Sequence, residues 1–430
     1  MNRVWLIIFG DFIAFWISFF IIILVRFEPV SYQAAISAHI VPFIILYLTW
    51  VLSFYLFGLY DLFTIKPTIP HLRRFGMAIS ISFVIGIFLF YFISIFGISP
   101  KTNLIFQIVG FGIISFFIRR IIYILFSKAI TRPAILVGSS ESINEIKNVI
   151  INNPQLGLRL ALHTENGVNA IRDYSNTSNT VFIFEKIPDD IPKEQILSIY
   201  KNNSEIINMA QAYERYLNKI SINHVTQSWV VENIDIKVNI LYMLTRKVVD
   251  VLFAILVIVI TSPLLAISAL FIYLHDNKTI FYIQERVGLN GKIFKLYKLR
   301  SMIINSEENG AVWTERNDSR ITPVGKVIRK IHIDEVPQML NIIKGDISLV
   351  GPRPERPEFV AQLEKVIPHY ELRHIIHPGF TGWAQIKYRY ANTEKDSKEK
   401  FEYDLYYIKN RNIFLDFGII LRTIQIIFTH

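Results

Sequence analysis

Four long apolar runs in the first third of the chain constrain its fold more than any other feature. They cover residues 4–25, 41–59, 75–98 and 104–126, and each can supply the ~20 residues that cross the hydrocarbon core of a bilayer. The first run is too long for a removable signal peptide and lacks a small-residue cleavage site. With 52% hydrophobic residues, the chain is also more apolar than most soluble proteins. We therefore predict a membrane protein with four transmembrane helices within residues 1–132.

Basic residues predict how these helices are oriented. They gather before the first run, between the second and third, and at the end of the fourth, whereas the other two loops carry little beyond Arg26 and Lys101. Because Lys and Arg accumulate in cytoplasmic loops, we expect the N-terminus and everything after Arg132 in the cytoplasm. Asp11 lies inside the first run. We expect it to pair with Arg3 or to reach the headgroups, although an intramembrane acid can also be functional.

Charge and cysteine content narrow the chemistry. The formal net charge is +10, which suits either a cytoplasmic membrane surface or polyanionic substrates, and composition does not separate the two. The chain has no cysteine, so disulfides, Cys-zinc sites, Fe–S clusters and thiol nucleophiles are excluded. His369, His374 and His377 lie close together in sequence but match no zinc motif. A metal would be held by carboxylates and phosphates, which suits Mg²⁺.

Residues 133–240 have the pattern of a small α/β domain. The expected strands are 134–137, 158–162, 181–184 and 206–209, with a helical stretch over 143–151. Strands that alternate with helices indicate a parallel sheet. The turn Gly138-Ser139-Ser140 has one glycine where a dinucleotide fingerprint has three. Backbone therefore cannot approach a pyrophosphate closely, and we expect a degenerate Rossmann-like domain without a nucleotide cofactor.

A fifth apolar run covers residues 248–273 and has basic residues close on both sides. A straight span would place one basic cluster outside the cell, against the usual bias. Ser262-Pro263 lies in the middle of the run, where proline removes one helical hydrogen bond. We therefore favour a re-entrant helix over residues 247–273 that bends at Ser262-Pro263 and returns. The alternative is a kinked fifth span.

Three further pieces follow this run. Residues 284–302 alternate basic and aromatic side chains around two glycines; Asp334-Glu335 precedes a helical pattern; and Pro352-Arg353-Pro354 forms a stiff loop. Each piece alone has an ordinary structural explanation: the first as a solvated loop, the second as an Asp N-cap and the third as a rigid turn. A helix N-terminus also attracts phosphate, and arginine suits forked phosphate recognition. Of two adjacent carboxylates, one can attack phosphorus while the other binds Mg²⁺.

In this order and spacing, the four pieces resemble the bacterial sugar transferase family, whose members are polyprenyl-phosphate sugar-1-phosphate transferases that begin surface polysaccharide synthesis. The resemblance covers about residues 243–430 and continues through 378–385 and 403–407 to Asp416 and Thr423. By layout, the apolar runs and the α/β domain are similar to the family's long form. The implied fold is a four-helix transmembrane region, a degenerate Rossmann-like α/β domain and a mainly α catalytic domain, residues 241–430, with a re-entrant helix.

The resemblance implies roles for particular residues. Asp334 is implied to be the nucleophile that takes the sugar-phosphate and releases a nucleoside monophosphate, and Glu335 to help hold Mg²⁺. The helix break falls on Ser262 and Pro263. The implied phosphate-binding residues are Lys292, Arg300, Arg329, Arg353 and Arg356. A UDP-sugar is the implied donor and polyprenyl (undecaprenyl) phosphate the acceptor.

The chain departs from the family pattern in places. It has Asn277-Lys278-Thr279 where Gly-Pro is usual, Leu299 for Phe, Ile331-His332 for Thr-Ser, and His377 for a common Arg. None of these touches the acidic pair, but His377 leaves the donor sugar open. The terminal run over residues 413–428 can lie along the membrane or pack on the domain. We expect a multi-pass protein of the bacterial inner membrane with its catalytic domain on the cytoplasmic face, and no nucleic acid partner. A homodimer through the added domains is an open expectation.

Two other classes of function compete with this one. A non-enzymatic membrane protein with a nucleotide-binding regulatory domain predicts an intact glycine loop, which residues 138–140 lack. A glycosyltransferase that moves sugar without phosphate predicts an Asp-x-Asp metal motif, which the chain does not contain. The released nucleotide separates the classes, because phosphosugar transfer gives UMP and glycosyl transfer gives UDP.

Overall fold

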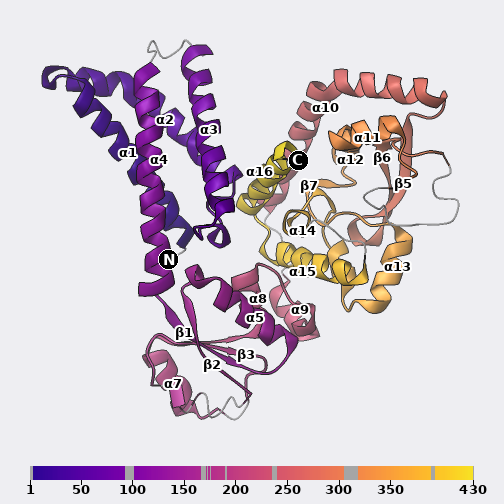
Figure 1. Cartoon of the computed structure of the whole chain (residues 1–430). Coiled ribbons are helices and arrows are strands. Elements are labelled where there is room, and N and C mark those ends of the chain that lie inside the picture. The colour runs from indigo at the N-terminus through magenta and orange to yellow at the C-terminus, as the bar shows by residue number, and fades with distance from the viewer. Residues whose placement is uncertain are drawn as a thin grey trace. The chain divides into compact units, whose positions relative to one another are not determined.

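The computed structural model (Figure 1) describes residues 3–92, 101–165, 171, 173–174, 176–188, 191–234, 240–304, 318–388 and 393–429. The chain divides into two compact units, Met1–Ala212 and Tyr213–His430. Within the second unit, Ile220, Ile222 and Val225 pack with Phe401 and Leu405 in one buried cluster.

The first unit opens with four long apolar helices. They are α1 (Arg3–Arg26), α2 (Tyr32–Leu56), α3 (Ile69–Phe92) and α4 (Lys101–Ile124), and a π-helical turn, Leu125–Ala129, extends the last. All four are long and apolar enough to cross a membrane. The predicted N-terminal membrane helices are therefore confirmed, and the chain fits a multi-pass membrane protein.

Aromatic side chains fill the centre of this bundle. Phe15, Trp50, Phe54 and Phe111 are almost fully buried, and the rings of Trp50 and Phe111 lie 5.1 Å apart. Trp50 Nε1 donates a hydrogen bond to the Ser82 carbonyl at 2.9 Å. Lipid tails are as apolar as these side chains, so close packing rather than the hydrophobic effect holds such a bundle together.

Asp11 is paired across the bundle, with a partner that the sequence analysis did not name. Its carboxylate forms an ion pair with Arg119 of α4 and accepts a hydrogen bond of 2.6 Å from the Ser115 hydroxyl. Arg119 Nη1 also donates to the Leu59 carbonyl at 2.7 Å. Asp11 and Arg119 are 1% and 3% exposed, so they satisfy each other inside the bundle. The side chain of Arg3 lies outside the described part of the chain.

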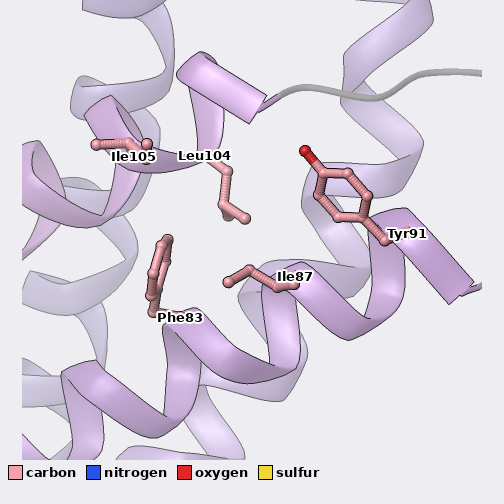
Figure 2. Close-up of a pocket in the computed structure, with 5 residues that line it drawn as sticks. All are labelled: Phe83, Ile87, Tyr91, Leu104 and Ile105. Carbon is pink, nitrogen blue, oxygen red and sulfur yellow. The ribbon is translucent and has the colours of Figure 1, made fainter.

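An apolar pocket of about 260 Å³ lies between α3 and α4 (Figure 2). Its lining residues are Phe83, Ile87, Tyr91, Leu104 and Ile105. Among the described residues that line it, none is charged, so these side chains do not suit phosphate chemistry.

A four-stranded parallel sheet completes the first unit. Its order is β2-β1-β3-β4, and its strands are β1 (Arg132–Val137), β2 (Leu158–Thr164), β3 (Val181–Phe184) and β4 (Glu205–Asn208). Its helices are α5 (Glu141–Asn152) and α7 (Lys193–Lys201), and α8 (Met209–Leu217) contains the boundary with the second unit. The predicted strands are thus found. Alternating β and α segments put Ile135, Phe182 and Phe184 into one buried cluster.

The second unit is mainly helical. It contains α9 (Gln227–Asn233), α10 (Ile240–Asp276), the antiparallel hairpin of β5 (Phe281–Val287) and β6 (Ile293–Leu299), α11 (Pro323–Lys330), the 3₁₀ helix η8 (Ile333–Gln338), α12 (Met339–Lys344), α13 (Pro357–Val366), the 3₁₀ helix η9 (Tyr370–His374), α14 (Trp383–Lys387), α15 (Glu394–Asn410) and α16 (Ile413–Thr429). Two short strands of this unit, β7 (Ser348–Val350) and β8 (Gly379–Thr381), pair in parallel with each other.

Helix α10 bends, as Figure 1 shows, while remaining one helical element. Pro263 has no amide hydrogen for the carbonyl of Val259, four residues earlier. The Ser262 hydroxyl donates to that carbonyl instead, at 2.8 Å. A backbone carbonyl left without a donor is costly in lipid. The Ser-Pro pair therefore permits a bend without an orphaned acceptor.

Both arms of α10 contact the same unit. Ala254 of the first arm and Ile272 of the second belong to one buried cluster. Near the start, Asp250 accepts a hydrogen bond from the Ser348 hydroxyl at 2.5 Å. At the end, Asp276 forms an ion pair with Arg300. The bend thus brings the two ends of a 37-residue helix back to a single domain.

Candidate active site

Asp334 and Glu335 lie in the first turn of η8. The residue before this turn is His332, whose φ of 57° is left-handed. Helix formation therefore starts earlier than an N-cap at Asp334 would require, and both carboxylates belong to the helical turn. They lie beside β6, because that strand packs against η8.

Glu335 is held by two cations. Lys298 Nζ lies 3.0 Å and Arg353 Nη2 2.6 Å from its Oε1 atom. Although burial raises the pKa of Glu335, the charges and hydrogen bonds of Arg353 and Lys298 outweigh that effect and lower it well below the usual range. Glu335 is therefore an anion at neutral pH.

Asp334 has a different environment. It is 7% exposed, and it forms no salt bridge within the described residues. Burial, followed by the negative charge of Glu335, raises the pKa of Asp334 to about 6, while Lys298 and Arg329 oppose the rise. Two adjacent carboxylates thus differ in basicity. A weakly acidic carboxylate without a paired cation is suited to nucleophilic attack.

The Pro352-Arg353-Pro354 loop is fixed by its own carbonyls. The carbonyl of Pro352 accepts from the Gly379 amide, that of Arg353 from Arg373 Nη2, and that of Pro354 from Arg286 Nη1, each at 2.9 Å. Three separate elements therefore hold this backbone. The Arg353 guanidinium is aimed at Glu335 from a rigid base.

A buried ion pair supports this loop from behind. Arg373 Nη2 lies 3.1 Å from Asp404 of α15, and both side chains are at most 6% exposed. Burial raises the pKa of Asp404 to about 6 although the charges of Arg373 and Lys400 oppose it. Asp404 thus compensates the buried charge of the arginine that holds the Arg353 carbonyl.

Glycine is required where the loop meets β8. A Cβ atom on Gly379 would lie 2.1 Å from the Gly351 amide nitrogen, and one on Gly382 would lie 2.2 Å from the Gly351 oxygen. Real Cβ atoms do not approach backbone so closely. Since Gly351 directly precedes Pro352, this backbone-to-backbone contact sets the position of the arginine loop.

The other predicted phosphate-binding residues have different partners. Arg329 Nε bonds to the Ser301 hydroxyl at 2.8 Å and is close enough to Asp334 to lower its pKa. Arg300 is paired with Asp276. Lys292 is exposed at the turn between β5 and β6, and Arg356 lies 3.3 Å from Glu358 at the start of α13. Their phosphate-binding roles stay predictions.

Sequence reasoning missed Lys298 as a partner of the acidic pair. The residue stands two positions before Arg300 in the same basic stretch, and only the hairpin geometry shows which of the two reaches Glu335. Arg286 and Arg373 were also missed as supports of the arginine loop. Arg286 lies within the basic stretch of residues 284–302, but nothing in that stretch indicates that it bonds to the Pro354 carbonyl.

Comparison with known proteins places residues 241–430 in the family described as bacterial sugar transferase. The chain is 46% identical over 132 residues to a putative undecaprenyl-phosphate N-acetylgalactosaminyl 1-phosphate transferase of Bacillus subtilis strain 168, covering 31% of this chain and 74% of that protein.

Two longer relatives match over part of their length. A UDP-N-acetylgalactosamine-undecaprenyl-phosphate N-acetylgalactosaminephosphotransferase of Aeromonas hydrophila is 45% identical over 189 residues, which are 44% of this chain and 45% of that protein. A UDP-glucose:undecaprenyl-phosphate glucose-1-phosphate transferase of Escherichia coli K12 is 34% identical over 183 residues, 42% of this chain and 39% of that protein. The match therefore spans less than half the length of these two relatives.

Proposed function

Because this chain belongs to the bacterial sugar transferase family, we propose that it transfers a sugar-1-phosphate from a UDP-sugar to polyprenyl (undecaprenyl) phosphate. The products are a polyprenyl-diphosphate sugar and UMP. The observation that carries the proposal is the contrast within the acidic pair: Glu335 is ion-paired to Lys298 and Arg353, while its neighbour Asp334 keeps a raised pKa. The reaction would be an early membrane step of surface polysaccharide or glycoconjugate synthesis.

In the first half-reaction, an Asp334 carboxylate oxygen attacks the phosphorus that bears the sugar. The new bond joins that phosphorus to Asp334, and the bond to the bridging oxygen breaks, so that UMP leaves with the electron pair. Arg353 and Lys298 provide positive charge beside the reacting phosphate, and Arg329 adds more. Phosphoryl transfer depends mainly on positioning and charge neutralisation, which is what fixed cations supply.

In the second half-reaction, an oxygen of polyprenyl phosphate attacks the same phosphorus. The bond to Asp334 breaks, and the carboxylate is restored. A lipid acceptor requires an active site near the membrane surface, and α10, which packs on η8 and α12, provides the connection to the bilayer.

The residues present fit Mg²⁺. Lys298 and Arg353 both bond to Glu335 Oε1, which leaves Oε2 for a metal. The described residues contain no group of three or more His, Asp or Glu that could hold one, so substrate phosphates and water would supply the other ligands. When bound, Mg²⁺ would neutralise charge on the diphosphate.

We infer that the donor is a UDP-N-acetylhexosamine. Among these sugars, UDP-N-acetylgalactosamine is the donor that we expect to react fastest. The relatives named for N-acetylgalactosamine are 45% and 46% identical to this chain, whereas the E. coli relative named for glucose is 34% identical.

A donor assay tests the function. Membranes that contain the full chain are incubated with Mg²⁺, polyprenyl phosphate and one UDP-sugar at a time, and the released nucleotide is identified. We expect UMP, most rapidly with UDP-N-acetylgalactosamine, together with a lipid-linked sugar diphosphate. Release of UDP would instead assign the chain to glycosyl transfer, and UMP from UDP-glucose alone would overturn the donor assignment.

The acid limb of the pH profile provides a second test. Asp334 must be ionised to attack, and burial together with Glu335 raises its pKa to about 6. UMP release should therefore fall about tenfold per pH unit below pH 6. Lys298→Gln should shift this midpoint to higher pH, because Lys298 favours the ionised form of Asp334. A profile that stays flat down to pH 5 would contradict the assignment of Asp334.

We further propose that α10 is a re-entrant helix in the bacterial inner membrane and that the second unit lies on the cytoplasmic face. Both arms of α10 return to one domain. The helix is long and apolar enough to cross a membrane, but length alone does not distinguish a helix that enters and returns from one that crosses.

Single cysteines test this topology on a chain that has none of its own. Lys247→Cys and Lys278→Cys, both exposed near the two ends of α10, should react with an impermeant maleimide from the cytoplasmic side only. Val30→Cys, in the exposed link between α1 and α2, is the control for the outer face. If Lys278→Cys labels from the same side as Val30→Cys, α10 crosses the membrane.

A further inference from the structure

The α/β sheet of the first unit has a place where related sheets hold phosphate. In the order β2-β1-β3-β4, the connections run in opposite directions from β1 and β3. In open α/β sheets, ligands bind outside the carboxyl ends of the strands at this switch point. Here the turn after β1 is Gly138-Ser139-Ser140, and α5 begins at Glu141. The backbone amides at the N-terminus of a helix such as α5 can bind an anion.

A carboxylate of the chain itself occupies this end. Glu185 follows β3 directly, and its Oε2 atom accepts hydrogen bonds from the amides of Ser139 and Ser140 at 3.1 and 3.2 Å. The Glu185 amide donates to the Val137 carbonyl at 2.9 Å, which continues the pairing of β1 with β3. The backbone of Glu185 is therefore fixed, and its side chain reaches back over the turn.

Gly138 makes room for this carboxylate. Its φ is +138°, and a Cβ atom at this position would lie 2.3 Å from Glu185 Oε2. In a dinucleotide fingerprint, a glycine lets the backbone approach the pyrophosphate. In this chain the single glycine of the turn lets the backbone approach Glu185.

The turn is also held from its other side. His163 Nε2 lies 3.0 Å from the Gly138 carbonyl, and Lys147 Nζ lies 3.2 Å from His163 Nδ1. A ring with its proton on Nε2 satisfies both contacts. The Ser140 hydroxyl accepts from the Ile143 amide at 3.3 Å. The amides of Ser139 and Ser140, the Gly138 carbonyl and the Ser140 hydroxyl are thus all engaged within the domain.

We propose that Glu185 is a built-in anion that seals the nucleotide-binding turn of this sheet. The carboxylate takes the place of a ligand phosphate, satisfies the same amides, and repels a second anion. The α/β domain is therefore a structural module that works without a bound nucleotide. This inference does not depend on the transfer reaction proposed for the second unit.

Hydrogen exchange of the full chain tests the proposal locally. Peptides that cover residues 138–145 report on the amides of Ser139 and Ser140, so phosphate bound in the second unit does not affect the measurement. In the wild type, exchange should be slow and should not change with inorganic phosphate, ADP or NAD⁺. In Glu185→Ala, it should become roughly tenfold faster, because hydrogen bonds to a charged acceptor are lost. Inorganic phosphate should then restore the protection.

Glu185→Gln is the matched variant, because it keeps the shape and removes the charge. Exchange should quicken less than in Glu185→Ala, and phosphate should have no effect since the amide still fills the site. Peptides of β2 show whether the sheet remains folded. If Glu185→Ala unfolds the sheet, the comparison of Glu185→Gln with the wild type decides, and exchange should then be faster in the variant. Unchanged exchange in both variants, a phosphate or nucleotide effect in the wild type, or a folded Glu185→Ala that phosphate does not protect would each overturn the proposal.

Discussion

Asp334→Asn should reduce UMP release by at least about 1,000-fold, as expected when an enzyme loses its nucleophile. The substitution preserves the size of a buried side chain, but an amide does not form the bond to phosphorus that the first half-reaction requires. The cations around Glu335 stay in place, so donor binding should persist. Initial rates of UMP release with a saturating UDP-sugar and polyprenyl phosphate measure the loss.

Trapping the intermediate separates a nucleophile from a residue that only positions substrate. With donor labelled in its sugar and no lipid acceptor, the wild type should retain label after denaturation, and Asp334→Asn should retain none. Glu364→Gln, an exposed acid of α13 in the same unit, controls for the loss of one carboxylate and should behave like the wild type. An Asp334→Asn protein that releases UMP at a few per cent of the normal rate would require a different nucleophile.

The parts of the site that could be predicted are formed by residues that are neighbours in the sequence. Asp334-Glu335 and Pro352-Arg353-Pro354 each carry their chemistry within a few positions, and the structure brings Glu335 and Arg353 into contact. The choice between Lys298 and Arg300 could not be made, because it depends on how the β5–β6 hairpin faces η8. The Arg373–Asp404 pair joins residues 31 positions apart, and no local pattern indicates it.

The same distinction applies to the fold. Apolar runs of sufficient length predicted the membrane helices, and short β-rich segments between helical ones predicted the strands of the sheet, because both patterns follow from local burial. The start of η8 was missed because His332 adopts a left-handed conformation that asparagine or glycine would have signalled. The seal formed by Glu185 could not be foreseen, since a single acid after a strand has no characteristic spacing.

Arg119→Met should destabilise the helical bundle of the first unit by about 3–5 kcal/mol, which is the effect of removing one partner from a buried ion pair. Asp11 would keep its bond to the Ser115 hydroxyl but would lose the only cation with which it pairs among the described residues. The Leu59 carbonyl would also lose its donor. Titration with a denaturing detergent, followed by tryptophan fluorescence, measures the change in the free energy of unfolding.

Arg120→Met is the matched control, because Arg120 is the next residue of α4 but is exposed; its effect should stay below about 1 kcal/mol. The double variant Asp11→Leu/Arg119→Met should recover much of the lost stability, since two apolar side chains leave no unpaired charge in the bundle. If the double variant is as unstable as Arg119→Met, the contacts of the guanidinium with Leu59 and with the rings of Phe54 and Tyr60 matter more than the charge of Asp11. If Arg119→Met and Arg120→Met unfold alike, the pair does not hold α1 to α4.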